Sequence, residues 1–143
     1  MPDMLSVSRD LPIPRWKAWE WLTESYLTAK WYGPYRMMGN TLLITMIHED
    51  GKPEVEGALL DYADGRMLRL RAGTVKEGFV FRVQLDDAPG GTRVTVSQER
   101  ANDESDQWYE AGWHFYLDAL ANAVAGKPAP VFADYEPKTD KKR

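Results

Sequence analysis

The chain has 143 residues, enough for one ordinary domain, and its 43% hydrophobic residues with six tryptophans can build an apolar interior. Its formal net charge of -4, with no dense Lys/Arg patch before the last residues, argues against nucleic-acid binding, because the phosphate backbone favours positive surfaces. Without cysteine the chain can form no disulfide, thiolate nucleophile or cysteine-ligated metal site.

Neither end of the sequence suggests a membrane protein. The N-terminal MPDMLSVSRDLPIP carries acids and lacks a continuous apolar run, so no signal peptide is expected. No stretch approaches the ~20 apolar residues of a membrane span. The basic cluster KTDKKR at residues 138–143 is interpreted as a solvated end. These features predict a cytoplasmic protein with no membrane partner and no nucleic-acid partner.

A short strand is expected first and a pair of helices second. Residues 5–10 alternate between apolar and polar side chains, as in a strand with one buried face, until Pro12 ends the pattern. Pro14 suits the first position of a helix, because its fixed φ is helical and its missing N–H is not needed there. The apolar face of that helix would hold Trp16, Trp19 and Leu22. A second helical piece over residues 25–30 leads into the segment WYGPY.

Five further segments read as strands separated by short turns. They cover residues 41–50, 53–62, 66–72, 78–87 and 92–100. In the last three, apolar side chains occupy alternate positions, with charged or polar side chains between them. Short turns join consecutive segments, which predicts an antiparallel meander with one dry face and one wet face.

The last predicted element is a long helix over residues 105–125. The acids of NDESD suit its N-terminus, and Gly126 suits its end. At 100° per residue one apolar stripe would face the sheet, formed by Tyr109, Trp113, Tyr116, Leu117, Leu120 and Val124. Gly112, Ala119 and Ala123 form a small-residue edge beside this stripe, where another element would be able to approach closely.

Two aromatic residues of this helix, Trp108 and Phe115, lie nearly opposite the stripe and need a cover. The Pro-rich tail, which carries Val131, Phe132 and Tyr135, is predicted to fold back over them; a homodimer through Trp108 and Phe115 is the alternative. Residues 1–127 are assigned to one domain. Residues 128–143 are assigned to a tail that packs in part and is then disordered.

The order of these elements resembles that of the START/SRPBCC (birch-pollen-allergen-like) superfamily. The motifs that carry the resemblance are AWEWLT at 18–23, KWYGP at 30–34, GGTRVTV at 90–96 and GWHFYLDAL at 112–120. More narrowly, they resemble the branch named for the activator of heat-shock protein 90 ATPase homologues. At the position of Tyr32 that branch has a second tryptophan. The resemblance implies an α+β helix-grip fold. In that fold a curved antiparallel sheet wraps around a long C-terminal helix, with two short helices after the first strand.

In this superfamily the gap between sheet and long helix is usually a ligand cavity, so the resemblance implies a small hydrophobic or aromatic ligand and no cofactor. The residues expected to line it are Trp31, Tyr32, Tyr35, Ile44, Met46, Leu68, Leu70, Phe79, Phe81, Tyr109, Trp113 and Tyr116. The alternative for Trp31 and Trp113 is a plain place in the core. The hypothesis requires a cavity of roughly 300 Å³ or more.

Specific binding also needs a few polar groups in the apolar wall. The candidates are Tyr32, Tyr109, Tyr116, His48, Glu56 and Gln98. Arg69 and Arg71 would join them only if their strand slipped by one residue, which would bury two cations.

Catalysis has little support in the sequence. His48 and His114 are the only histidines, and HED at residues 48–50 lacks the H-E-x-x-H spacing of a metal-binding helix. No catalytic residue and no metal ligand is assigned. Three functions stay open: a carrier or sensor of a small molecule, which is favoured, a co-chaperone-like interaction module, and an enzyme of the cyclase or aromatase kind.

Overall fold

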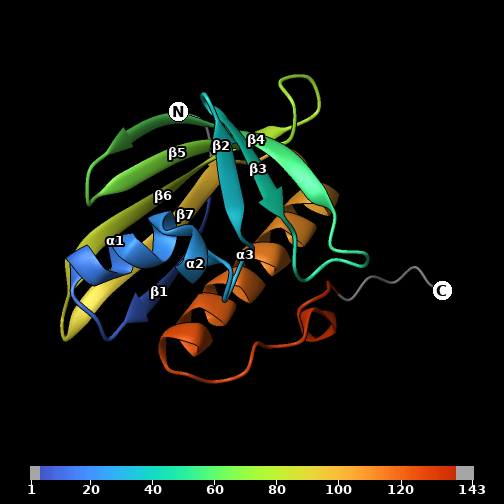
Figure 1. The fold of residues 1–143 in the computed structure, drawn as a ribbon. Coiled ribbons are helices and arrows are strands. Elements are labelled where there is room, and N and C mark those ends of the chain that lie inside the picture. The colour runs from blue at the N-terminus through green and yellow to red at the C-terminus, as the bar shows by residue number, and fades with distance from the viewer. Residues whose placement is uncertain (1–3, 138–143) are drawn as a thin grey trace.

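A computed structural model describes residues 4–137, which form one seven-stranded sheet and three α-helices (Figure 1). All neighbouring strands are antiparallel, in the order β1-β7-β6-β5-β4-β3-β2. The strands are β1 (Met4–Leu11), β2 (Tyr35–Met38), β3 (Thr41–Thr45), β4 (Glu54–Ala63), β5 (Met67–Ala72), β6 (Phe79–Ala88) and β7 (Gly91–Glu99). The helices are α1 (Arg15–Thr23), α2 (Ser25–Thr28) and α3 (Asp103–Val124), followed by a short 3-10 helix, η1 (Phe132–Asp134).

The sheet curves around α3, while α1 and α2 lie beside that helix and α1 packs over β6 and β7 (Figure 1). This arrangement confirms the predicted helix-grip fold. The prediction missed β2, since that strand is only four residues long and three of its residues are exposed, so its sequence shows no alternation. It also made β3 five residues too long, because the chain leaves the sheet after Thr45.

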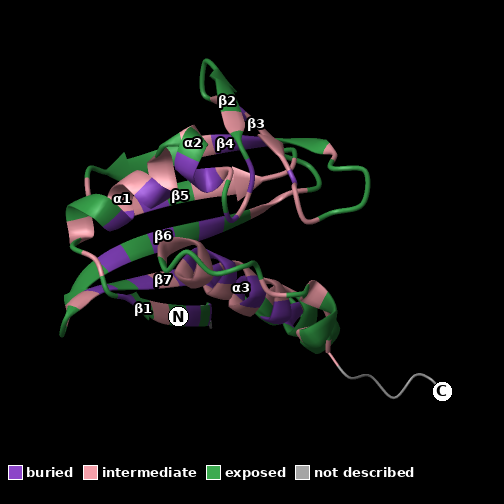
Figure 2. Cartoon of the chain, turned by 60° about the horizontal axis from the view of Figure 1, so that its bottom comes forward, coloured by how far each residue is buried: buried purple, intermediate pink, exposed green. Residues whose placement is uncertain are grey.

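The core lies where the alternating faces of the strands meet α3. Along β7, Thr92, Val94, Val96 and Gln98 are all buried, and Arg93 between them is exposed. Figure 2 shows the same contrast for the whole chain: buried residues gather on α3, β6 and β7, and the hairpin tips are exposed. This period of two confirms the predicted dry and wet faces.

Helix α3 begins two residues before the predicted start. The side chain of Asn102 accepts a hydrogen bond from the Ser105 N–H at 2.9 Å, which satisfies one of the free donors of the first turn. Gly126 follows the helix with a φ of 73°, as expected for a left-handed helix end. The close approach predicted along the small-residue edge does not occur at Gly112, where a Cβ would meet nothing within 4 Å. Ala119 of the same edge is buried, and β1 packs on α3. Within residues 4–137, no helix is long and apolar enough to cross a membrane.

The tail runs back along α3 (Figure 1). Phe132 and Tyr135 contact the Phe115 ring by their edges, with centroids 5.4 and 5.6 Å away, and Phe115 is left only 1% exposed. The fold-back prediction is therefore right for Phe115, which its own chain covers instead of a second copy. Trp108 stays 43% exposed, so the homodimer remains a prediction with Trp108 as its accessible residue. The predicted disordered end, residues 138–143, lies outside the described residues.

The tail is tied to α3 and β1 through Asp118. Its carboxylate accepts hydrogen bonds from Arg9 Nε and from the Tyr135 hydroxyl, each at 2.7 Å. Arg9 also reaches Nδ1 of His114 at 2.8 Å, so His114 is a paired surface residue, as expected. Burial by itself raises the pKa of Asp118, but the bonds from Arg9 and Tyr135 and the nearby positive charge outweigh it and hold that pKa below its ordinary value of 3.8.

The contribution of Asp118 to stability should therefore depend on pH. Because its pKa is lower in the folded chain, its contribution is fully present above about pH 4 and is lost as the pH falls through the folded pKa. We expect Asp118→Asn to destabilise the protein at neutral pH and to have a smaller effect below pH 3.8. Urea unfolding of both proteins across this range measures the difference. A difference that did not change with pH would contradict the assignment.

Candidate functional site

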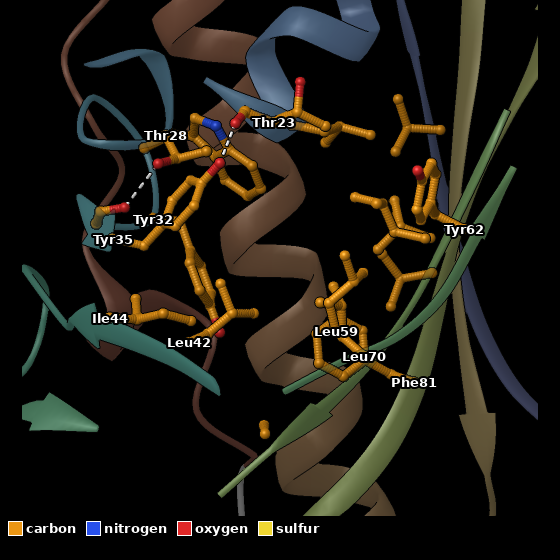
Figure 3. Close-up of a pocket in the computed structure, with 18 of the residues that line it drawn as sticks. Thr23, Thr28, Tyr32, Tyr35, Leu42, Ile44, Leu59, Tyr62, Leu70 and Phe81 are labelled. Carbon is orange, nitrogen blue, oxygen red and sulfur yellow. Dashed lines mark hydrogen bonds between the residues drawn. The ribbon is translucent and has the colours of Figure 1, made fainter. Parts of the chain in front are cut away.

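A cavity of about 320 Å³ lies between the sheet, α1 and α3 (Figure 3). The helices contribute Trp19, Leu22, Thr23, Thr28, Trp113 and Leu117 to its wall. The strands contribute Tyr35, Met37, Leu42, Ile44, Leu59, Tyr62, Leu68, Leu70, Arg71, Ala72, Phe81, Val83, Val94 and Val96, and the connecting segments contribute Trp31, Tyr32, Gly33 and Asp64. In Figure 3, Tyr32, Leu42 and Ile44 stand on one side of the cavity, and Leu59, Leu70 and Phe81 stand on the other.

The segment after α2 is shaped to enter this wall. The Thr28 carbonyl accepts hydrogen bonds from the N–H groups of Trp31, Tyr32 and Gly33, and the Thr28 hydroxyl donates to the Gly33 carbonyl at 2.8 Å. Glycine is required at position 33 because a Cβ there would lie 1.8 Å from the Thr45 carbonyl oxygen. The segment is thus pressed against β3. Trp31, which is 9% exposed and donates to the Trp21 carbonyl, both lines the cavity and belongs to the core.

Eight of the twelve residues expected to line a cavity do so: Trp31, Tyr32, Tyr35, Ile44, Leu68, Leu70, Phe81 and Trp113. The expected place of the other four is corrected. Met46 lies past the end of β3, and Phe79 and Tyr109 pack on each other with centroids 4.7 Å apart. Tyr116 lies behind the wall, where its ring packs on Tyr32 and on Phe115, with centroids 4.7 and 5.1 Å away.

Several wall residues were missed by the sequence prediction. Trp19 and Leu22 had a signal, since they lie on the apolar face of α1, but nothing showed that this face meets the cavity. Tyr62 had no such signal. The pairing of β4 with β5 shifts between Leu59 and Asp61, so Leu59 and Tyr62 both face the cavity at a spacing of three instead of two.

Most polar groups of the wall are paired within the protein. The Tyr35 hydroxyl donates to the Thr23 carbonyl, and the Thr23 hydroxyl donates to the Trp19 carbonyl at 2.8 Å. Burial, followed by the Glu24 charge, raises the pKa of Tyr35. Trp113 Nε1 donates to Gln98 Oε1 at 2.6 Å, beneath the cavity floor, so the predicted polar candidate Gln98 serves to position a wall residue.

Two other predicted polar candidates lie outside the wall. His48 places Nε2 3.0 Å from the Trp31 carbonyl and its ring edge on Phe115, with centroids 4.9 Å apart. Glu56 forms an ion pair with Arg71. Arg71 lines the cavity although Leu68 and Leu70 of the same strand also face it, as predicted, so no change of register is needed. Among the residues that the structure describes, no three His, Asp or Glu side chains are placed to hold a metal ion.

Comparisons with known proteins agree with this architecture. The family model described as Activator of Hsp90 ATPase homolog 1-like protein matches residues 12–125. Protein BPP1335 from Bordetella parapertussis is 23% identical, with a TM-score of 0.73 over 99% of this chain and 92% of its own. Protein SSP2350 from Staphylococcus saprophyticus is 14% identical, with a TM-score of 0.77 over 91% and 99%. CalU16 from Micromonospora echinospora is 14% identical, with a TM-score of 0.72 over 92% and 80%. At these identities the three structures show the fold alone. The comparison with curated proteins gives no match.

Proposed function

The chain belongs to the Activator of Hsp90 ATPase homolog 1-like family of the SRPBCC superfamily, and on this basis we propose that its cavity binds a small apolar or aromatic molecule. The protein would act as a carrier or sensor of that molecule. The observation that carries the proposal is the cavity of about 320 Å³ itself, since ligand sites for small molecules begin near 300 Å³ and are mostly apolar. Protein interiors are close-packed and hold few voids larger than a water molecule, so a space of this size is unusual.

The composition of the wall supports an apolar ligand. Three tryptophans, Trp19, Trp31 and Trp113, lie around the cavity with aliphatic side chains from six strands between them. Large aromatic surfaces hold flat apolar molecules well, because they offer a wide contact area and lose little side-chain entropy. The two tryptophan indoles with hydrogen bonds to the protein, those of Trp31 and Trp113, are fixed before any ligand arrives.

Filling the cavity should weaken binding. Leu70→Trp places a larger side chain in the wall, and we expect it to weaken the binding of 2-ethylnaphthalene at least about tenfold. The matched control is Val80→Trp on the neighbouring strand, at an exposed position that does not line the cavity. Quenching of tryptophan fluorescence gives the affinities, and circular dichroism checks that both variants fold. Equal binding by Leu70→Trp and the wild type would contradict the proposal.

Native mass spectrometry of freshly purified protein, repeated after denaturation, tests the proposal without a chosen probe. The expected result is a small apolar molecule of defined mass that leaves on unfolding.

The co-chaperone alternative rests on the description of the family, and it predicts a change in the ATPase rate of Hsp90 when this protein is added. A changed rate that Leu70→Trp leaves intact would favour that alternative over the cavity.

A further inference from the structure

One polar group of the cavity wall differs from the others because the protein does not satisfy it. Among residues 4–137, the hydroxyl of Tyr32 has no hydrogen-bond partner, although the hydroxyls of Thr23, Thr28 and Tyr35 all donate to carbonyls. Tyr62 and Asp64 also line the cavity, but both are exposed at its edge. Tyr32 is half-buried, and among the described residues no fully buried side-chain polar atom lacks a partner, so its hydroxyl is open to accessible space. A hydroxyl left open in an apolar wall is a group to which a ligand in the cavity can bind.

The ring of Tyr32 is held firmly in place. It contacts Trp31 and Tyr116, with centroids 5.5 and 4.7 Å away, and its backbone N–H donates to the Thr28 carbonyl at 2.8 Å. Figure 3 shows Tyr32 on the side of the cavity formed by Leu42 and Ile44. The ring contacts and the backbone hydrogen bond therefore hold the hydroxyl in a fixed position.

The charges around the cavity disfavour an anionic ligand. Arg71 is the one cation among the described lining residues, and it is engaged by the Gly73 carbonyl at 2.9 Å and by the Glu56 carboxylate at 3.8 Å. Asp64 adds a negative charge at the edge. Burial and, to a smaller extent, the Glu49 carboxylate raise the pKa of Tyr32 to about 12, so its hydroxyl remains a donor at neutral pH. A carboxylate that entered this site would lose its hydration without meeting a free cation.

We propose that the ligand is a neutral, mainly apolar molecule with a carbonyl or hydroxyl oxygen that accepts a hydrogen bond from Tyr32. This inference rests on the proposed function and adds the chemical class of the ligand and its orientation. The oxygen lies at the wall formed by Tyr32, Leu42 and Ile44, and the apolar body extends toward Leu59, Leu70 and Phe81. The cavity thus distinguishes alcohols and ketones from hydrocarbons of the same shape and from the corresponding acids.

Three probes that share one ring system test the proposal: 2-acetylnaphthalene, 2-ethylnaphthalene and 2-naphthoate. Titrations at neutral pH are followed by quenching of tryptophan fluorescence. We expect the ketone to bind about tenfold more tightly than the hydrocarbon, because it satisfies the Tyr32 donor, and the carboxylate to bind more weakly than both. In Tyr32→Phe the ketone should lose its advantage, while the affinity for 2-ethylnaphthalene stays unchanged.

The control variant is Tyr35→Phe, which removes a hydroxyl of the same wall that already donates to a carbonyl. It should keep the preference for the ketone. If Tyr32→Phe does not fold, the wild-type protein still decides. The infrared carbonyl band of bound 2-acetylnaphthalene should lie at a lower wavenumber than in hexane, as a hydrogen-bonded carbonyl does.

The outcomes separate the two claims. Absence of binding by all three probes would overturn the proposed function. Equal binding of ketone and hydrocarbon, or an unshifted carbonyl band, would overturn the role of Tyr32 and leave the cavity function intact. Binding of 2-naphthoate as tight as that of the ketone would overturn the neutral class of the ligand.

Discussion

Replacing Trp113 with alanine is expected to lower the free energy of unfolding by about 4 kcal/mol. The side chain is 8% exposed, and its ring packs on Phe81 with centroids 4.8 Å apart. Truncation would leave a hole in the core beside an existing cavity. It would also leave Gln98 Oε1 buried without its donor, which adds to the cost. Since domains of this size are stable by about 5–15 kcal/mol, the loss is a large fraction of the total.

Urea unfolding followed by circular dichroism measures this effect. The matched control is Trp108→Ala on the same helix, where the side chain is 43% exposed and we expect a loss below about 1 kcal/mol. Trp113→Phe, which keeps a ring and loses the bond to Gln98, should fall between the two. Similar losses for Trp108→Ala and Trp113→Ala would show that α3 does not face the sheet as described.

Gly33→Ala is expected to cost about 3 kcal/mol, because the new Cβ would lie 1.8 Å from the carbonyl oxygen of Thr45. Both partners of this clash belong to the backbone, so no side-chain rotation relieves it. The segment after α2 would have to separate from β3, where the Thr45 N–H now donates to the Pro34 carbonyl at 3.0 Å. Because this segment carries Trp31 and Tyr32, binding to the cavity should weaken as well.

Substitution of a second glycine provides a control for which the expected change in stability has the opposite sign. A Cβ at Gly112, in the middle of α3, would meet nothing within 4 Å, so Gly112→Ala should stabilise the protein by about 0.5–1 kcal/mol through helix propensity alone. Thermal or urea unfolding of the two variants tests the pair. A neutral Gly33→Ala would mean that the segment and β3 are not in the contact described here.

The fold could be predicted from the sequence to a large extent. The alternation in β6 and β7 and the helical stripe of α3 are local patterns, and most of the residues that they predicted as buried are buried. In α3, however, Tyr109, Tyr116 and Val124 are only partly buried, while Phe115, predicted to lie opposite the stripe, is fully buried. Short motifs then placed the chain in its family. β2 escaped prediction because an edge strand of four mostly exposed residues needs no alternation to be stable.

The candidate site could be predicted only in part. The residues Trp31, Leu68 and Trp113 belong to apolar faces that the sequence shows, and the cavity uses them. Tyr62 reaches the wall through a register shift in β4, and Phe115 is covered by a tail that follows it by more than a dozen residues. Neither a bulge nor a return of the tail leaves a periodic signal.

By itself the sequence determined which faces of the strands and helices avoid water, because burial of apolar side chains follows the period of each element. Only the tertiary structure decided where those faces fail to meet. The space of about 320 Å³ exists because a curved sheet cannot close on a straight helix everywhere. The same geometry decided that the Tyr35 hydroxyl donates to the Thr23 carbonyl and that the Tyr32 hydroxyl has no partner among the described residues. This distinction depends on distances between segments and not on residue type.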